Sequence, residues 1–229
     1  MKLSIIIPVY NEEATLAQIV QKVREVELEG IEKEIVLVDD CSRDRSREII
    51  EQEAKAPGTL AVYHAVNQGK GAAIRSALQV ISGDMMIIQD ADLEYDPQEY
   101  RLLLDAKAKA GVRVVYGSRF KGQGDWKHFS HWLGNKGLTL LTNILYGVSL
   151  SDMETCYKLV DAELIKPIPL HSRRFEFEPE ITAKLLKRGQ RILEVPITYK
   201  GRKFEEGKKI TWRDGFIAAW TLIKYRFSE

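Results

Sequence analysis

Four apolar runs in the first half of the chain end in polar residues whose types suit the binding of a phosphate group or a metal ion. The residues after these runs are Tyr10-Asn11-Glu12, Asp39-Asp40, Gly69-Lys70-Gly71 and Asp90-Ala91-Asp92. In open parallel sheets, ligands bind beyond the carboxyl ends of the strands. The convergence of these polar ends therefore indicates a binding site more strongly than any one of them.

Asp90 and Asp92 are the candidate metal ligands. They lie two residues apart at the end of the apolar run 85–89, so in a pleated strand their side chains share a face. Their oxygens suit a hard cation such as Mg²⁺ or Mn²⁺, and Glu94 would add a third oxygen. Alternatively, Asp-x-Asp is a surface triplet that caps a helix beginning at Pro97. Burial beside an apolar strand is costly for carboxylates without compensation, which favours the metal site.

Gly69-Lys70-Gly71 opens a helical pattern and is a candidate anion site. Backbone N–H groups and the dipole at a helix start favour anions, and glycine lets a ligand approach the main chain. A plain turn with a solvated lysine is the alternative. The chain has no GxxxxGK[ST] motif and no GxGxxG after its first apolar run, which argues against P-loop nucleotidases and Rossmann dehydrogenases.

The elements that would position these residues alternate along the first half. We expect strands at 3–9, 34–39, 60–66, 85–89 and 112–117, and helices at 11–26, 43–55, 71–81 and 97–110. Continuous apolar runs of this kind are typical of parallel strands covered by helices on both faces, so the fold class is α/β. The second half is predicted to be helix-rich, with helices at 129–146, 178–188 and from 212, strands near 156–160 and 192–199, and a mobile loop at 122–125.

Composition sets the remaining limits. With 229 residues, 45% of them hydrophobic, the chain suits one α/β domain. A formal net charge of +1 gives no reason to expect a nucleic-acid partner. Cys41 and Cys156 lack metal-ligand spacing, so we expect free thiols in a reducing compartment. No run resembles a signal peptide or reaches the ~20 apolar residues of a spanning helix, so we expect a cytoplasmic protein.

Taken together, these motifs resemble those of the family 2 inverting glycosyltransferases of GT-A fold. The resemblance covers the whole chain and is carried by Ile5–Glu12, Val38–Ser46, Asn67–Gly71 and Asp90–Asp92 in their order and spacing. Gly117-Ser118-Arg119-Phe120 and Val195–Tyr199 with Arg202 make it most similar to dolichyl-phosphate or polyprenyl-phosphate mannosyl- and glucosyltransferases. It implies a Rossmann-like, mostly parallel sheet in a single domain, 1–229. Residues 1–120 would bind the nucleotide-sugar, and residues 121–229 would bind the acceptor and end in an amphipathic helix.

The resemblance also implies roles for individual residues. The base and ribose of the donor would be held by Pro8, Tyr10 and Glu12, with Asp39 or Asp40 on the base. Its diphosphate would be bound through Mg²⁺ or Mn²⁺ by Asp90, Asp92 and Glu94, with Lys70 nearby and a basic loop containing Arg202 and Lys209 closing over it. Arg119 would hold the acceptor phosphate, as suits a guanidinium. The expected donor is GDP-mannose, with UDP-glucose as the alternative.

Departures from the family pattern concern the acceptor. His131 and Asn135 stand where these relatives carry an arginine and a serine for the acceptor phosphate. Asp152-Met153-Glu154-Thr155-Cys156-Tyr157 replaces their Asp-x-x-Ser-Gly-Phe segment. A lipid phosphate arrives ionised and needs no general base, whereas a hydroxyl acceptor would need Asp152 or Glu154 to take its proton. Glycosylation of a soluble hydroxyl compound, or nucleotide-sugar binding without turnover, stays open as an alternative, although intact Asp90, Asp92 and Arg119 speak against the latter.

Membrane contact is expected to be peripheral. The predicted helices at 129–146 and 212–227 are too short to span, but they combine Trp or Tyr with nearby Lys and Arg, as interfacial helices do. We therefore expect them to lie at the cytoplasmic face of the membrane beside the acceptor lipid. The alternative is that they are core or dimer helices, and a membrane-protein partner or a homodimer stays open.

Overall fold

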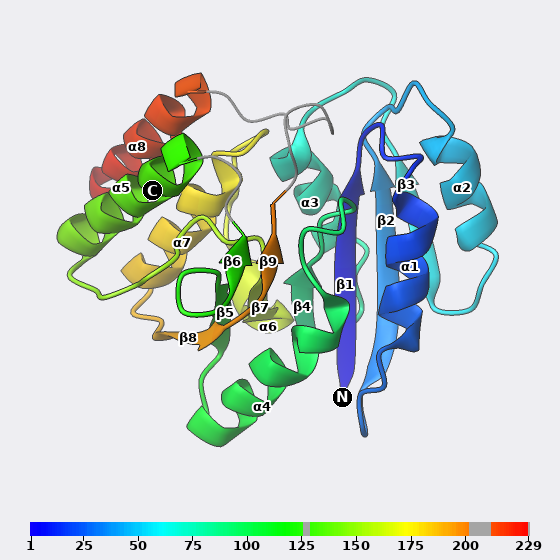
Figure 1. Cartoon of the computed structure of the whole chain (residues 1–229), viewed down its shortest axis with the longest axis horizontal. Coiled ribbons are helices and arrows are strands. Elements are labelled where there is room, and N and C mark those ends of the chain that lie inside the picture. The colour runs from blue at the N-terminus through cyan, green and yellow to red at the C-terminus, as the bar shows by residue number, and fades with distance from the viewer. Residues whose placement is uncertain (126–128, 202–211, 229) are drawn as a thin grey trace.

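The computed structural model describes residues 1–125, 129–201 and 212–228. At its centre lies a seven-stranded sheet in the order β3-β2-β1-β4-β7-β5-β8. Helices α1 and α2 lie beside the N-terminal strands, whereas α5, α7 and α8 gather beyond the other end of the sheet (Figure 1). The predicted α/β class with a mostly parallel sheet is confirmed.

The first half follows the predicted strand and helix alternation. Its strands are β1 (Lys2–Val9), β2 (Glu32–Asp39), β3 (Thr59–Tyr63), β4 (Met85–Ile88) and β5 (Val114–Ser118). Its helices are α1 (Leu16–Glu25), α2 (Ser46–Glu53), α3 (Lys70–Leu78) and α4 (Tyr100–Ala110), the last preceded by the 3₁₀ turn η1 (Pro97–Glu99). β1 pairs in parallel with β2 and β4. Every residue of β4 is buried, as expected for a strand covered on both faces.

One strand of the sheet runs against the others. β7 (Lys158–Asp161) is antiparallel to both β4 and β5, while β8 (Ile192–Pro196) is parallel to β5. An antiparallel strand begins where its parallel neighbours end. The segment that leads into β7 therefore lies at the carboxyl edge of the sheet, next to the residues that follow β4 and β5.

A second, two-stranded sheet corrects the prediction of a mobile loop at 122–125. β6 (Gly124–Asp125) pairs in parallel with β9 (Tyr199–Lys200). The backbone N–H of Tyr199 donates to the carbonyl of Gln123 at 3.0 Å. A Cβ on Gly122 would lie 2.0 Å from the carbonyl oxygen of Ile197, so glycine permits this close backbone approach. Gly122 thus serves close packing against Ile197.

The second half is helix-rich, as predicted. Its helices are α5 (Phe129–Tyr146), the short α6 (Ala162–Ile165), α7 (Phe177–Lys187) and α8 (Trp212–Phe227). α5 and α8 lie side by side (Figure 1), and the Tyr146 hydroxyl donates to the carbonyl of Leu222 at 2.8 Å. Within the described ranges, no helix has the length and apolar character needed to cross a bilayer.

Candidate active site

The polar residues that the sequence singled out lie around the carboxyl edge of the central sheet. Asp39 ends β2, Asp90 follows β4 and Arg119 follows β5. Asp152 joins them because it lies in the segment before β7, which begins at this edge. The topology thus brings residues from both halves of the chain to one edge.

The Asp40 carboxylate organises the loop before α3. It accepts hydrogen bonds from the backbone N–H groups of Gln68 at 2.8 Å and Gly69 at 2.7 Å. Its Oδ1 also lies 2.7 Å from Nδ1 of His64. With three such contacts and a residue exposure of 3%, Asp40 holds the position of the Gly69-Lys70-Gly71 turn.

Its neighbour Asp39 is fully buried and bound to the start of the next helix. It accepts from Arg47 Nε at 2.8 Å and from the backbone N–H of Ser42 at 2.9 Å. The structure thus places both carboxylates, one of which the resemblance assigns to the base, in hydrogen-bonded positions at the end of β2. Base binding by Asp39 or Asp40 stays a prediction.

The other residues expected on the nucleoside lie at the end of β1. Pro8 is within the strand, Tyr10 directly follows it, and both are partly buried. Glu12 is also partly buried, and its backbone N–H donates to Ser46 Oγ at 2.8 Å. These positions lie beside β2, so the structure brings them close to Asp39. Arg202 and Lys209, expected in a loop over the donor, lie outside the described residues.

The glycines at the start of α3 pack against another part of the chain, and anion binding at this helix start stays a prediction. A Cβ on Gly69, whose φ is +95°, would lie 2.4 Å from the carbonyl oxygen of Arg173. A Cβ on Gly71 would lie 2.7 Å from the carbonyl of Ser172, and the N–H of Ala72 donates to the Arg173 carbonyl at 3.0 Å. The glycines therefore allow close packing against the chain before α7, and this part of the helix start binds protein.

Lys70 lies between two carboxylates from opposite halves of the chain. Its Nζ is 2.7 Å from Asp90 Oδ1 and 3.4 Å from Glu178 Oε1. Burial would lower the pKa of Lys70, but the negative charges of Asp90 and Glu178 outweigh it and hold that pKa well above its usual value. Lys70 is therefore a charged ammonium at the candidate metal ligand.

Asp90 and Asp92 fit a divalent cation that is completed by phosphate oxygens. Asp92 Oδ1 accepts the backbone N–H of Glu94 at 3.1 Å, and Glu94 Oε2 accepts the Tyr199 hydroxyl at 2.9 Å. Within the described ranges no group of three or more His, Cys, Asp or Glu side chains could hold a metal ion. The predicted set of three carboxylates with Glu94 is therefore not supported among the described residues. Mg²⁺ is usually bound through one or two carboxylates plus substrate phosphates, so Asp90 and Asp92 would hold it together with a diphosphate. The Lys70 ammonium lies on Asp90 Oδ1, so a metal ion bound to that oxygen would have to displace it.

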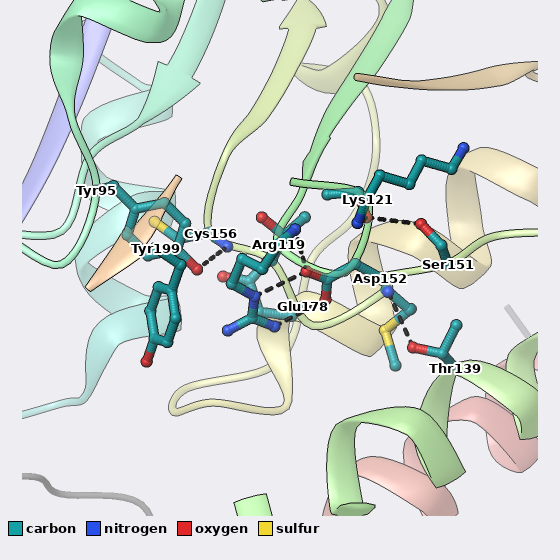
Figure 2. Close-up of polar contacts among 12 residues, drawn as sticks. Tyr95, Arg119, Lys121, Thr139, Ser151, Asp152, Cys156, Glu178 and Tyr199 are labelled. Atoms are coloured by element: carbon teal, nitrogen blue, oxygen red, sulfur yellow. Dashed lines mark hydrogen bonds and ion pairs between the residues drawn. The ribbon is translucent and has the colours of Figure 1, made fainter. Parts of the chain in front are cut away.

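Arg119 and Asp152, expected to act on the acceptor, form a buried bidentate pair (Figure 2). Arg119 Nε donates to Asp152 Oδ2 and Nη2 donates to Oδ1, both at 2.7 Å. The backbone N–H of Arg119 also donates to Oδ2 at 2.9 Å, and the guanidinium carbon lies 5.2 Å from the centre of the Tyr199 ring. Because both Asp152 oxygens accept from Arg119, Asp152 is poorly placed to take a proton from a hydroxyl group.

Glu154 is better placed for that role. It is partly buried, and its Oε1 has no hydrogen-bond partner within the described ranges. Burial raises the pKa of Glu154 to about 7, against the opposing charge of Lys158. A carboxyl group with this pKa exchanges a proton near neutral pH.

Sequence reasoning missed Lys158 and Glu178. Both are buried, and Lys158 Nζ lies 2.5 Å from Glu178 Oε2 and 2.9 Å from the carbonyl oxygen of Met153. The available signal was a lysine opening the apolar run of β7 and a glutamate between the aromatic Phe177 and Pro179 at the start of α7. Burying an unpaired charge costs free energy, so a charged residue in an apolar segment indicates a partner of opposite charge.

His131 and Asn135 lie on α5 at partly buried positions. This end of α5 contacts the residue after Arg119, because the Phe120 ring lies 6.2 Å from that of Trp132 and 3.9 Å from Lys136 Nζ. The structure thus places both residues on the helix that approaches the end of β5. Their role in acceptor binding stays a prediction.

Comparison with known proteins shows which family this chain resembles. The model of glycosyl transferase family 2 matches residues 4–168. The chain is 33% identical over 208 residues to the undecaprenyl-phosphate 4-deoxy-4-formamido-L-arabinose transferase of Edwardsiella ictaluri. That alignment covers 90% of this chain and 62% of the relative, so the chain spans less than two thirds of the relative's length.

Solved structures match the fold at low sequence identity. The glucosyl-3-phosphoglycerate synthase of Mycobacterium tuberculosis in complex with Mn²⁺, UDP and glucosyl-3-phosphoglycerate aligns with a TM-score of 0.74 at 19% identity. That match covers 100% of this chain and 81% of the other. The same enzyme with Mg²⁺ and UDP gives a TM-score of 0.75 at 18% identity, over 100% and 80% of the two chains. These matches establish a GT-A fold.

Proposed function

Because the chain belongs to glycosyl transferase family 2, we propose that it moves a hexose from a nucleotide-sugar to the phosphate group of a polyprenyl or dolichyl phosphate. The observation that carries this proposal is the pair Asp90 and Asp92 at the carboxyl end of β4, with the Lys70 ammonium 2.7 Å from Asp90. Carboxylates for a cation beside a fixed ammonium suit a diphosphate leaving group. The divalent cation, when bound there, neutralises charge on that leaving group.

In the proposed reaction an acceptor phosphate oxygen attacks the anomeric carbon in line with the departing diphosphate. The new C–O bond forms as the bond to the diphosphate breaks, so the anomeric configuration inverts. Lys70 would face the negative charge that develops on the diphosphate, while Tyr10, Glu12 and the carboxylates after β2 would orient the nucleoside. Arg119 would direct its guanidinium towards the acceptor side, fixed there by Asp152.

The relative's name supports a polyprenyl phosphate acceptor, since that enzyme is an undecaprenyl-phosphate transferase. The donor is the finer part of the proposal. The resemblance of the motifs favours GDP-mannose, and the presence of UDP in the matching solved structures makes UDP-glucose the second donor to test. Binding of Mn²⁺ or Mg²⁺ by those enzymes supports the use of a divalent cation here.

The outer faces of α5 and α8 support peripheral contact with a membrane that carries such an acceptor. Both helices expose large apolar side chains, namely Leu133, Leu140 and Ile144 on α5 and Phe216, Ile217, Trp220, Ile223 and Phe227 on α8. The basic residues Lys224 and Arg226 are also exposed at the end of α8. Apolar and aromatic groups next to basic residues suit an anionic lipid surface.

A hydroxyl acceptor is the second candidate, and Glu154 is the observation that favours it. Such an acceptor must lose a proton during transfer, and the pKa of Glu154, raised by burial to about 7, would let its carboxylate take that proton. Asp152 does not suit this step because it is paired with Arg119. Transfer to a hydroxyl compound that fails after Glu154→Gln would favour this candidate.

Removal of a metal-ligand charge tests the proposed function. Asp92→Asn, and likewise Asp90→Asn, should reduce transfer from GDP-mannose or UDP-glucose by at least about 100-fold, because an amide replaces an anionic metal ligand. Each factor of ten in rate corresponds to about 1.4 kcal/mol of activation barrier. The fold should stay intact. Asp105→Asn, on the exposed face of α4, is the matched control. If either variant transferred sugar within twofold of the wild-type rate at saturating Mn²⁺, Asp90 and Asp92 would not be the metal ligands.

A further inference from the structure

A line of alternating charges runs from the donor side of the site through α7 to β7. It begins at Asp90, passes through Lys70 to Glu178 and ends at Lys158, with successive contacts of 2.7, 3.4 and 2.5 Å. Asp90 and Lys70 belong to the first half of the chain, whereas Glu178 and Lys158 belong to the second. The line therefore connects the candidate metal ligand with the half expected to bind the acceptor.

Glu178 is an unusual member of this line. Its residue exposure is 5%, and neither carboxylate oxygen has a hydrogen-bond partner within the described residues. Its charge is balanced by contacts with the ammonium groups of Lys70 and Lys158. Burying a carboxylate in this way costs free energy. Its contact with Lys70 indicates that it acts on that ammonium group.

The Lys70 backbone is fixed at the start of α3 by the packing of Gly69 and Gly71 against residues 172–174. Its ammonium already lies 2.7 Å from Asp90 and 3.4 Å from Glu178, so a shift from one carboxylate to the other would need only a small movement. A divalent cation at Asp90 would repel the ammonium and compete with it for the same carboxylate oxygen.

We propose that Glu178 is a positioning residue that receives the Lys70 ammonium when a divalent cation binds Asp90. This inference rests on Asp90 as a metal ligand in the proposed function. In the metal-free protein Lys70 neutralises Asp90. In the metal-bound protein Lys70 pairs with Glu178, where its charge stays near the diphosphate without occupying the metal ligand.

Mn²⁺ binding with saturating GDP or UDP, which supply the phosphate oxygens but no sugar to transfer, tests this role directly, with the signal of free Mn²⁺ in electron paramagnetic resonance as the readout. Lys70→Gln should tighten Mn²⁺ binding by about fivefold or more, because no ammonium has to leave Asp90. Glu178→Gln should weaken it by about threefold or more, because Lys70 then has no second carboxylate. Glu178→Asp, which keeps the charge, should restore part of the affinity.

The double variant Lys70→Gln/Glu178→Gln separates positioning from a direct effect of charge. If Glu178 acts through Lys70, the double variant binds Mn²⁺ as tightly as Lys70→Gln alone. If Glu178 simply attracts the cation, the two effects add, and the inference is wrong. Because Glu178 also pairs with the buried Lys158, the comparison is repeated in a Lys158→Met background, where Glu178→Gln leaves no buried ammonium without its carboxylate.

Two controls remove an ion pair elsewhere. Arg24→Gln on α1 removes the guanidinium that pairs with Glu53, and Lys107→Gln on α4 removes the ammonium 2.8 Å from Asp161. Both should leave Mn²⁺ affinity unchanged. If the effects on Mn²⁺ affinity add in the double variant while the wild-type protein transfers sugar, the role of Glu178 is wrong but the proposed function stands. Coupled effects with no transfer to a polyprenyl phosphate would instead overturn the proposed function.

Discussion

At the scale of single residues, the Arg119–Asp152 pair changes what is expected from either side chain. A guanidinium at the end of β5 suggested a phosphate ligand, and a nearby aspartate suggested a base. The structure joins them in a bidentate contact with side-chain exposures of 7% and 0%. Each group therefore contributes to folding as well as to any contact with substrate, because a lone charge in this position lacks compensation.

Arg119→Ala should lower the free energy of unfolding by about 3–5 kcal/mol, because it leaves Asp152 buried without its partner. Urea denaturation at pH 7 measures this loss. The double variant Arg119→Met/Asp152→Asn should recover part of it, since neither remaining side chain carries a buried charge. Equal stability of wild type and Arg119→Ala would show that the pair does not contribute to folding.

Glu154 should make stability depend on pH. Burial raises its pKa to about 7 from an ordinary value of 4.5, so the folded state binds more protons between these pH values than the unfolded state. The free energy of unfolding should therefore fall as pH rises from about 4.5 to about 7. Glu154→Gln should remove this part of the slope. Denaturant titrations at pH 5 and pH 8 would contradict the assignment if both proteins showed the same pH dependence.

At the scale of elements, the antiparallel strand β7 builds the second side of the site. Because it starts at the carboxyl edge, it places Asp152 and Glu154 near Arg119 and places Lys158 beside Glu178. The sequence predicted a strand near 156–160 from its apolar residues, but its direction depends on pairing with β4 and β5, which are distant in the chain. Contacts such as Lys158–Glu178 follow from that direction, so local pattern alone did not predict them.

The bounds of α5 and α8 agree with the sequence analysis, since their apolar residues recur at helical spacing. The two-residue strands β6 and β9 were not predicted as a pair. They are too short to show a periodic pattern, and the two glycines within 122–125 by themselves predict a mobile loop. Their role, close approach to the backbone at Ile197, becomes evident only when residues 197–200 are placed beside them.

The exposed face of α8 should bind anionic membranes. Phe216 and Trp220, 70% and 65% exposed, lie one helical turn apart, so Phe216→Gln/Trp220→Gln should prevent flotation with anionic liposomes. Lys224→Gln should weaken binding by about fivefold, since one basic group near such a surface contributes about 1 kcal/mol. Leu102→Gln, which changes an exposed leucine on α4, is the matched control. Equal recovery of wild type with and without anionic lipid would contradict membrane docking.

At the scale of the whole molecule, a mainly parallel sheet collects charged residues from distant parts of the chain at one edge. The apolar runs of β1 and β4 predicted this sheet well, because a strand that is covered on both faces needs apolar residues at nearly every position. Asp90 and Asp92 were predicted from their place after such a run, whereas Arg119 was predicted from the resemblance to the family. The pairing of Arg119 with Asp152, and of Lys70 with Glu178, depends on how the two halves pack, which one sequence does not reveal.

The most direct test of the account compares two lipid acceptors that differ in one group. Wild-type protein, Mn²⁺ and a labelled nucleotide-sugar would be mixed in a single turnover with undecaprenyl phosphate or with undecaprenol, in liposomes of the same composition. The proposed function predicts sugar transfer to undecaprenyl phosphate, at least about 100-fold faster than to the alcohol, because only the phosphate presents an ionised nucleophile. Equal transfer to both lipids, or transfer to the alcohol alone that is lost in Glu154→Gln, would contradict it.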